Sequence, residues 1–211
     1  YRKENVILVT NGVMTDNFNY KKTKINNNQL TFGYVGTIGK AHNTKIILEA
    51  AKYFEDEKRI NFKIIGDGAE KETIFNQAMQ IKNITTKGLL LSNEIINEYD
   101  QIDVGLVTLK NDKLWSTALP TKIFEFLIQG KPVILSIPNG KTTQMIIKNK
   151  CGLVSKVDDA SSLIESINFY LKNPQLILSH GENGIKLISS KFNREKIAKN
   201  YLNQIIKLTK N

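Results

Sequence analysis

The stretch Ala118–Val133, A-L-P-T-K-I-F-E-F-L-I-Q-G-K-P-V, combines a helix start, an apolar helix and the opening of a buried strand. Pro120 suits the first position of a helix, because its fixed φ matches the helix and its missing N–H would be unpaired there. An apolar stripe follows, Gly130 predicts the helix end, and Pro132 opens a short apolar run typical of a buried strand. The stretch therefore predicts a loop, a helix and a parallel strand, the repeating unit of an α/β fold.

The predicted start of this helix suits a negatively charged ligand. Backbone N–H groups near Thr121, Lys122 and Ile123 have no partner inside the helix and lie at the positive end of its dipole, so they favour a phosphate or diphosphate. Lys122 adds a full positive charge, and Glu125 follows one turn later, where its carboxylate can accept hydrogen bonds from the vicinal hydroxyls of a ribose. One helix could thus hold both ends of a nucleoside diphosphate. The alternative is an ordinary α/β helix with a Lys and a Glu on its solvent side.

Hydrophobic periodicity predicts strands that alternate with helices along the rest of the chain. The expected strands are 6–10, 30–35, 61–65, 84–90, 104–108, 132–135 and 152–154, and the expected helices are 43–54, 70–82, one from Ser92, the one at Pro120, 144–149, 158–171, 174–190 and 195–210. This alternation is typical of a Rossmann-like, doubly wound parallel sheet with helices on both faces.

The polar stretch 15–29, rich in Asn and Lys, has the composition of a linker. We therefore expect residues 1–29 to be a crossover strand and linker from an amino-terminal domain absent from this chain, and residues 30–211 to be one ligand-binding domain. The apolar stripe on the last helix, which includes Ile197 and Tyr201, is expected to face that domain.

Three glycine loops are predicted at the carboxyl ends of strands, the edge at which doubly wound sheets bind ligands. They begin at Gly36, Gly66 and Gly88. Glycine lets the backbone approach a phosphate without a Cβ in the way. In the first loop Lys40 and His42 could meet a diphosphate or remain solvated. The spacing G-x-x-G, with no acidic residue at the end of the next strand, argues against a nicotinamide or flavin site.

The composition limits the possible partners. A net charge of +10 over 211 residues suggests phosphates or anionic lipid headgroups, but the lysines are scattered and aromatic residues are not interleaved with them, which argues against nucleic acid. No apolar run is long enough to span a bilayer, and a single cysteine, Cys151, fits a reducing cytoplasm. No paired Asp or His spacing predicts a metal site.

Taken together, the motifs resemble the carboxyl-terminal, donor-binding domain of retaining GT-B glycosyltransferases, the group 1 or family 4 type. The most specific match is the signature P-[ST]-K-x-x-E followed by G-x-P-V-I, which Leu119–Glu125 and 130–134 carry. The other matches are Val9–Val13 with Phe18 to the crossover from the first domain, Tyr34–Gly39 to the first donor-domain loop, and Ile64–Gly68 to the second.

The resemblance implies a domain that binds a nucleotide-diphospho-sugar, with UDP as the expected nucleotide, for retaining transfer to a glycan or lipid-linked acceptor in polysaccharide or lipopolysaccharide biosynthesis. Glu125 would hold the ribose hydroxyls and Lys122 would stabilise the leaving diphosphate, with no metal or other cofactor. Both residues are expected to bind the donor and stabilise charge rather than to move protons. The implied binding set is Gly36, Thr37, Lys40, Gly66, Gly88, Leu89, Pro120, Thr121, Lys122 and Glu125.

The sequence also departs from the family pattern. Thr117 stands where many relatives carry a glutamate that touches the donor sugar, and Thr37 and Asn43 stand where an Arg and a Lys are usual. Two alternatives therefore stay open: a non-catalytic sugar-nucleotide-binding module, and a UDP-sugar epimerase of GT-B fold. We expect a hexosyl- or N-acetylhexosaminyl-type transferase whose fragment alone is inactive. Its place would be the cytoplasm, with basic residues that could dock the intact enzyme on the inner face of the membrane.

Overall fold

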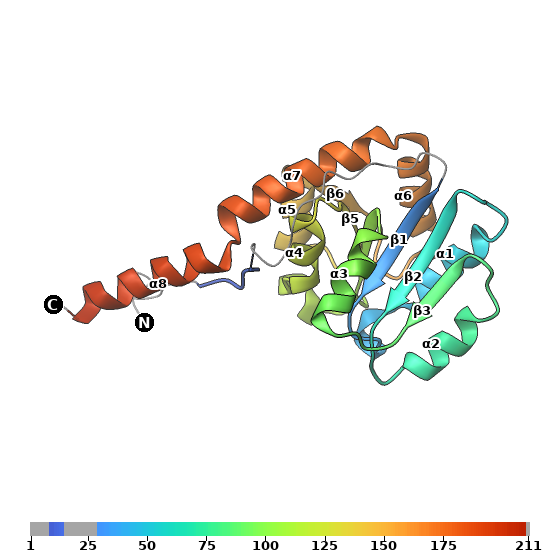
Figure 1. Ribbon diagram of the computed structural model, residues 1–211, viewed down its shortest axis with the longest axis horizontal. Helices are drawn as coiled ribbons and strands as arrows, with labels where there is room; N and C mark the ends of the chain where they lie inside the picture. The colour runs from blue at the N-terminus through green and yellow to red at the C-terminus, as the bar shows by residue number, and fades with distance from the viewer. Residues whose placement is uncertain (1–8, 15–28, 210–211) are drawn as a thin grey trace.

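The computed structural model describes residues 9–14 and 29–209. Its centre is a parallel sheet of six strands in the order β3-β2-β1-β4-β5-β6 (Figure 1). Because the order reverses between β1 and β4, Phe32 on β1 pairs with Phe62 on one side and with Val104 on the other. This confirms the predicted doubly wound sheet. The strands are β1 Leu30–Val35, β2 Ile60–Ile65, β3 Ile84–Lys87, β4 Val104–Thr108, β5 Val133–Ser136 and β6 Gly152–Val154.

Two apolar cores hold the helices on the two faces of the sheet. One lies under α1, α2 and α6, and the other lies under α3, α4 and α5, while α7 contributes to both. Adjacent residues of β5 alternate between them: Ile134 packs in the first core and Val133 in the second. The helices are η2 Lys40–His42, α1 Lys45–Tyr53, α2 Lys71–Ala78, α3 Ser92–Asp100, η3 Lys113–Thr117, α4 Thr121–Ile128, α5 Lys141–Lys148, α6 Ala160–Lys172, α7 Gln175–Lys191 and α8 Arg194–Thr209.

Several predicted boundaries were wrong by a few residues; α5, for example, starts at Lys141 instead of residue 144. Helix α2 ends at Ala78 instead of residue 82, because the following amides, such as that of Ile81, close tight turns rather than α-helical ones. Strand β3 ends at Lys87, so the predicted residues up to 90 form a loop. Pro120 is the cap before α4 and not its first residue, since its ψ of 122° is extended. The last difference moves the unpaired amides of the helix start to the residues after Pro120.

The amino-terminal residues that the structure describes pack against the junction of α7 and α8. Val13 forms a parallel bridge with Asn193, and its amide donates to the Phe192 carbonyl at 2.9 Å. The Phe192 ring stacks on that of Phe124, with centroids 4.5 Å apart. From this junction α8 extends away from the sheet (Figure 1). Residues 6–8 of the predicted first strand and 15–28 of the predicted linker lie outside the described residues.

Candidate functional site

The floor of the candidate site is backbone from the loops after β1, β2 and β3. The Gly36 amide donates to Ile65 at 2.9 Å, and the Gly66 amide donates to Lys87 at 3.0 Å, so each loop leaves the sheet tied to the next. Gly66 has a φ of 153°, and a Cβ there would lie 1.8 Å from the Gly36 carbonyl oxygen. Only glycine fits here, where the loops after β1 and β2 cross.

The start of α4 faces this floor. The amide of Ile123 was predicted to be unpaired, but it donates to the Pro120 carbonyl at 3.2 Å, because Pro120 is the cap that precedes the helix. The amides of Thr121 and Lys122 make no hydrogen bond within the described part of the chain. Two N–H groups at the positive end of the helix dipole are thus available to an anion. The Lys122 side chain, 40% exposed, adds its charge at the same place.

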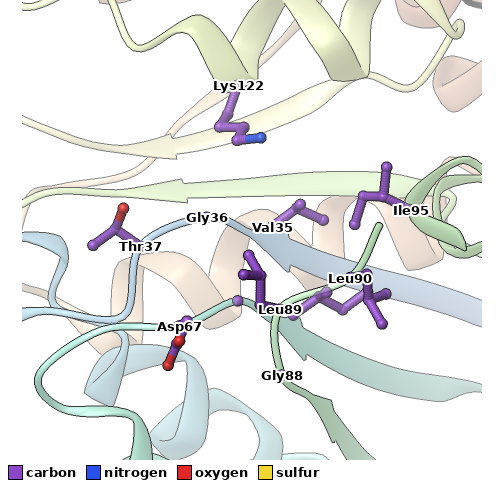
Figure 2. Close-up of a pocket in the computed structure, with 11 residues that line it drawn as sticks. Val35, Gly36, Thr37, Asp67, Gly88, Leu89, Leu90, Ile95 and Lys122 are labelled. Atoms are coloured by element: carbon purple, nitrogen blue, oxygen red, sulfur yellow. The ribbon is translucent and has the colours of Figure 1, made fainter. Parts of the chain in front are cut away.

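The loops and the α4 start enclose a cleft with two lobes, which we call the outer lobe and the inner lobe. The outer lobe, of about 450 Å³, lies between Lys122 and the loops after β1 to β3 (Figure 2). The inner lobe, of about 250 Å³, lies between the loop after β1 and the residues that begin α4. Val35, Gly36, Thr37 and Lys122 line both lobes. Lobes of these sizes suit a small ligand that extends through both.

The lobes differ in chemistry. In Figure 2 Lys122 descends from α4 toward the loop at Gly36, while Leu89 and Leu90 rise from the loop after β3 on the other side. Leu89 is 80% exposed, so it presents an apolar surface to solvent. The outer lobe therefore offers an apolar wall to a flat or ring-shaped group, and the inner lobe offers donors and positive charge.

Glu125 lies directly behind Lys122 and lines neither lobe. Its Oε2 accepts hydrogen bonds from the Tyr99 hydroxyl at 2.7 Å and from Lys122 Nζ at 3.0 Å. Burial, followed by the charge of Glu125, raises the pKa of Tyr99, so the hydroxyl stays protonated and donates. Within the described residues Oε1 has no hydrogen bond, and the side chain is 25% exposed. One carboxylate oxygen is thus fixed and the other is available to a ligand.

The structure gathers most of the predicted residues in one place. Of the predicted binding residues, those that line the outer lobe are Gly36, Thr37, Gly66, Gly88, Leu89 and Lys122. Pro120 and Thr121 line the inner lobe. Lys40 lies in the short turn η2, is exposed and lines neither lobe. Thr117, at the end of η3, is exposed as well.

Sequence reasoning did not select three residues that shape the cleft. Asp67 lines the outer lobe from the second glycine loop, where the motif G-D-G was a usable signal. Ile95 lines it from α3, and Tyr99 holds Glu125 from the same helix. An isolated apolar or aromatic residue in a helix indicates only a core position, so no signal separated these two from other core residues.

Two kinds of feature are absent from the part of the chain that the structure describes. Among residues 9–14 and 29–209, no group of three or more His, Cys, Asp or Glu side chains is placed to hold a metal ion. In the same part of the chain, none of the helices has the length and apolar character needed to cross a membrane.

Comparison with known families gives the class of the protein. Residues 16–187 match the family model described as glycosyl transferases group 1. The chain belongs to this family. The match includes all three glycine loops, the start of α4 and all six strands of the sheet.

Individual relatives agree with the family. TuaH of Bacillus subtilis (strain 168), which carries a provisional assignment as a teichuronic acid biosynthesis glycosyltransferase, is 28% identical over 139 residues, or 63% of this chain and 34% of TuaH. Among solved structures, Anabaena HepE in complex with UDP gives a TM-score of 0.79 at 15% identity, over 98% of this chain and 58% of HepE. A sucrose-phosphate synthase of Thermosynechococcus elongatus gives a TM-score of 0.78 at 18% identity, over 96% of this chain and 52% of the synthase.

These likenesses confirm the predicted fold, a Rossmann-like domain that corresponds to part of a GT-B glycosyltransferase. The chain spans about half the length of the two solved structures and about a third of TuaH.

Proposed function

We propose that this domain binds a UDP-sugar in the two-lobed cleft and presents it for transfer to a glycan or lipid-linked acceptor. The observation that carries the proposal is the pair of unbonded amides at Thr121 and Lys122, which face two glycine loops at the carboxyl edge of the sheet. Support comes from HepE, whose structures in complex with UDP and with UDP-glucose share this fold, with TM-scores of 0.79 and 0.77.

The shape and charge of the cleft favour one orientation of the donor. The base would lie in the outer lobe against Leu89, because an apolar wall suits a ring and repels a phosphate. The diphosphate would lie at the start of α4, between the amide of Thr121 and Gly36. The ribose would then lie between them, within reach of the available oxygen of Glu125.

This orientation explains the resting pair of Lys122 and Glu125. The ion pair is half exposed, so it is weak and easily exchanged for a ligand. When a diphosphate binds, the ammonium of Lys122 turns to it and leaves Glu125 held by Tyr99 alone, with its other oxygen directed to the ribose hydroxyls. The resting pair thus keeps both side chains near their proposed ligand positions.

The proposed chemistry is electrostatic. As the bond from the anomeric carbon to the diphosphate oxygen breaks, negative charge grows on the departing UDP. The acceptor hydroxyl oxygen bonds to that carbon, and its proton passes to a phosphate oxygen of the departing UDP. Lys122 and the helix-start amides would stabilise that charge, the task that a metal ion performs in other transferases. We propose that transfer retains the anomeric configuration, requires no metal, and takes place in the cytoplasm during surface-polysaccharide assembly.

A non-catalytic nucleotide-sugar-binding module is the second candidate, and Thr117 is the observation that favours it. Its exposed side chain ends η3, three residues before the cap of α4, and supplies no carboxylate there. The module would bind the same donor but support no transfer when the complete protein is supplied with acceptors.

The first test is a calorimetric titration of this chain with UDP-glucose, UDP, GDP, ADP and NAD. Selective binding of the two uridine ligands, unchanged by EDTA, is the expected result, because the proposed contacts to the diphosphate come from backbone amides and Lys122. Equal binding of NAD, or no uridine binding at all, would contradict the proposal. For the complete protein, NMR of the product formed from UDP-α-sugar should show an α-glycoside; a β-product would contradict retention, and absence of transfer would favour the module.

A further inference from the structure

His42 enters the inner lobe from the turn after β1, opposite Thr121 and Lys122. Its backbone is held on two sides: the amide donates to Gly39 at 2.8 Å, and the carbonyl accepts a hydrogen bond from the Thr108 hydroxyl. The turn thus directs the imidazole of His42 to the lobe, whereas Lys40, two residues earlier, lines neither lobe.

The ring of His42 has unused hydrogen-bonding capacity. Its Nδ1 is buried and has no hydrogen bond of good geometry among the described residues; the backbone of Gly39 is its polar neighbour. Burial, only partly opposed by that backbone, lowers the pKa of His42 below its ordinary value. The imidazole is therefore mainly neutral near pH 7 while the lobe is empty.

The charges around His42 leave the lobe without a resident anion. Lys122 on α4 and the hydroxyl of Tyr34 on β1 line the same lobe, and none of the described residues that line it is Asp or Glu. The Tyr34 hydroxyl donates to the Thr37 carbonyl at 2.6 Å, and burial raises its pKa, so it stays neutral. The other charged residues beside the turn are Lys40, Lys110, which bonds the Ala41 carbonyl, and Asp158, which bonds Asn43.

We propose that His42 takes up a proton when a diphosphate enters the inner lobe, and that the resulting imidazolium binds the diphosphate together with Lys122. The inference rests on the proposed function and adds that binding of the ligand is coupled to uptake of a proton. A diphosphate diester brings two negative charges to a lobe that otherwise holds a lysine, and an adjacent anion favours the charged form of a histidine. His42 would then do what Lys40 was expected to do, but only in its protonated form.

The pH dependence follows from the sign of this change. Ligand binding raises the pKa of His42, so the bound state holds more protons than the free state between the two pKa values. Affinity is highest at low pH and falls as the pH rises through that interval. Above the pKa of the bound state, and below that of the free state, affinity no longer changes with pH.

The experiment uses UDP-glucose, because its diphosphate diester has no group that titrates near neutral pH, unlike the terminal phosphate of UDP. Titrations of this chain at pH 7 in buffers with different ionisation enthalpies should show uptake of a substantial fraction of one proton. Affinity at pH 8 should be about tenfold weaker than at pH 6. His42→Gln should abolish both effects, and Lys148→Gln, on the exposed side of α5 and outside the lobes, should keep them.

A direct readout is available because the chain contains two histidines, His42 and His180. In ¹⁵N-NMR spectra of the labelled rings, saturating UDP-glucose should raise the pKa of His42 and leave that of His180 unchanged, since His180 pairs with Tyr170 away from the cleft. Binding of UDP-glucose with no proton uptake, or with a neutral His42 ring, would overturn this inference and leave the proposed function intact. Failure of the wild-type chain to bind UDP-glucose would overturn both.

Discussion

Helix α4 has a lysine near each end, and the two lysines differ in exposure and in their charged neighbours. Lys122 lies in the first turn at the carboxyl edge of the sheet, with a side chain 40% exposed and a weak pair to Glu125. Lys131 lies three residues after the helix, at the amino edge, and is 5% exposed. Burial lowers the pKa of Lys131, and Asp103 and Asp100 oppose that lowering.

If the proposed function is right, the difference separates binding at one end of the helix from stability at the other. At the amino edge the buried cation and the half-buried Asp103 compensate each other, and Asp103 also accepts a hydrogen bond from the Thr31 amide at 2.8 Å. At the carboxyl edge the cation and the amides remain accessible, and in the proposed function a ligand supplies the opposite charge. Substitutions at the two edges should therefore change different measurements.

The largest expected effect tests whether the carboxyl edge also has a purely structural requirement. Gly66→Ala should reduce the free energy of unfolding by about 3 kcal/mol, because its φ of 153° is strained for any side chain and the new Cβ would meet the Gly36 carbonyl. Gly39→Ala is the matched control: its φ of −146° is ordinary, and its Cβ would be 3.8 Å from the nearest atom. Urea unfolding of both variants measures the difference, and equal stabilities would refute the proposed crossing of loops.

The next effect belongs to the amino edge. Lys131→Met should reduce the free energy of unfolding by about 2 kcal/mol, since it leaves the half-buried Asp103 without its cation. Affinity for UDP-glucose should stay within twofold of wild type. The exposed Lys148→Met on α5 serves as the control and should change stability by less than about 0.5 kcal/mol. A loss of UDP-glucose binding in a stable Lys131 variant would contradict the prediction that this end of α4 contributes to stability and not to binding.

The sequence predicted the binding end of α4 better than the structural end, for a physical reason. Pro120, Lys122 and Gly130 are local signals, because caps and turns depend on residues close in sequence. The role of Lys131 depends on Asp103, which precedes β4 and meets it only once the sheet has formed. No spacing in the chain indicates that contact.

The same reasoning explains Lys40 and His42. The glycine loop after β1 was found from sequence, but which of its polar residues enters the cleft depends on the three-residue turn η2, whose geometry no periodicity reports. Asn43 then adopts a left-handed conformation, with a φ of 40°, which ends the turn just after His42. Loop composition could therefore place the site but could not order its side chains.

A third prediction returns to the binding end. Lys122→Met should weaken UDP-glucose binding about 20-fold, because a charged hydrogen bond to the diphosphate is lost. The melting temperature should hardly change, since the half-exposed pair with Glu125 contributes little to stability. Calorimetry measures the affinity for UDP-glucose, and thermal melting of the same preparation measures the melting temperature. Unchanged binding would remove Lys122 from the proposed diphosphate site, and a large fall in stability would make it resemble Lys131.

The smallest predicted effect concerns Glu125, because two consequences of its removal oppose each other. Glu125→Gln takes the carboxylate from the ribose but also frees Lys122 from its resting partner at 3.0 Å, which favours the diphosphate. The amide oxygen can still accept from Tyr99, so the side chain should stay in place. The net loss of UDP-glucose affinity should be about fivefold.

A cycle with 2′,3′-dideoxy-UDP-glucose, which lacks both vicinal hydroxyls, separates these two consequences. If Glu125 binds the ribose, the variant and the dideoxy ligand remove the same interaction, so their losses should not add. With the dideoxy ligand, Glu125→Gln should then bind as well as wild type or better, since only the release of Lys122 remains. Additive losses would show that Glu125 acts through Lys122 alone, and the two residues at this end of α4 would then form one electrostatic unit with no separate ribose contact.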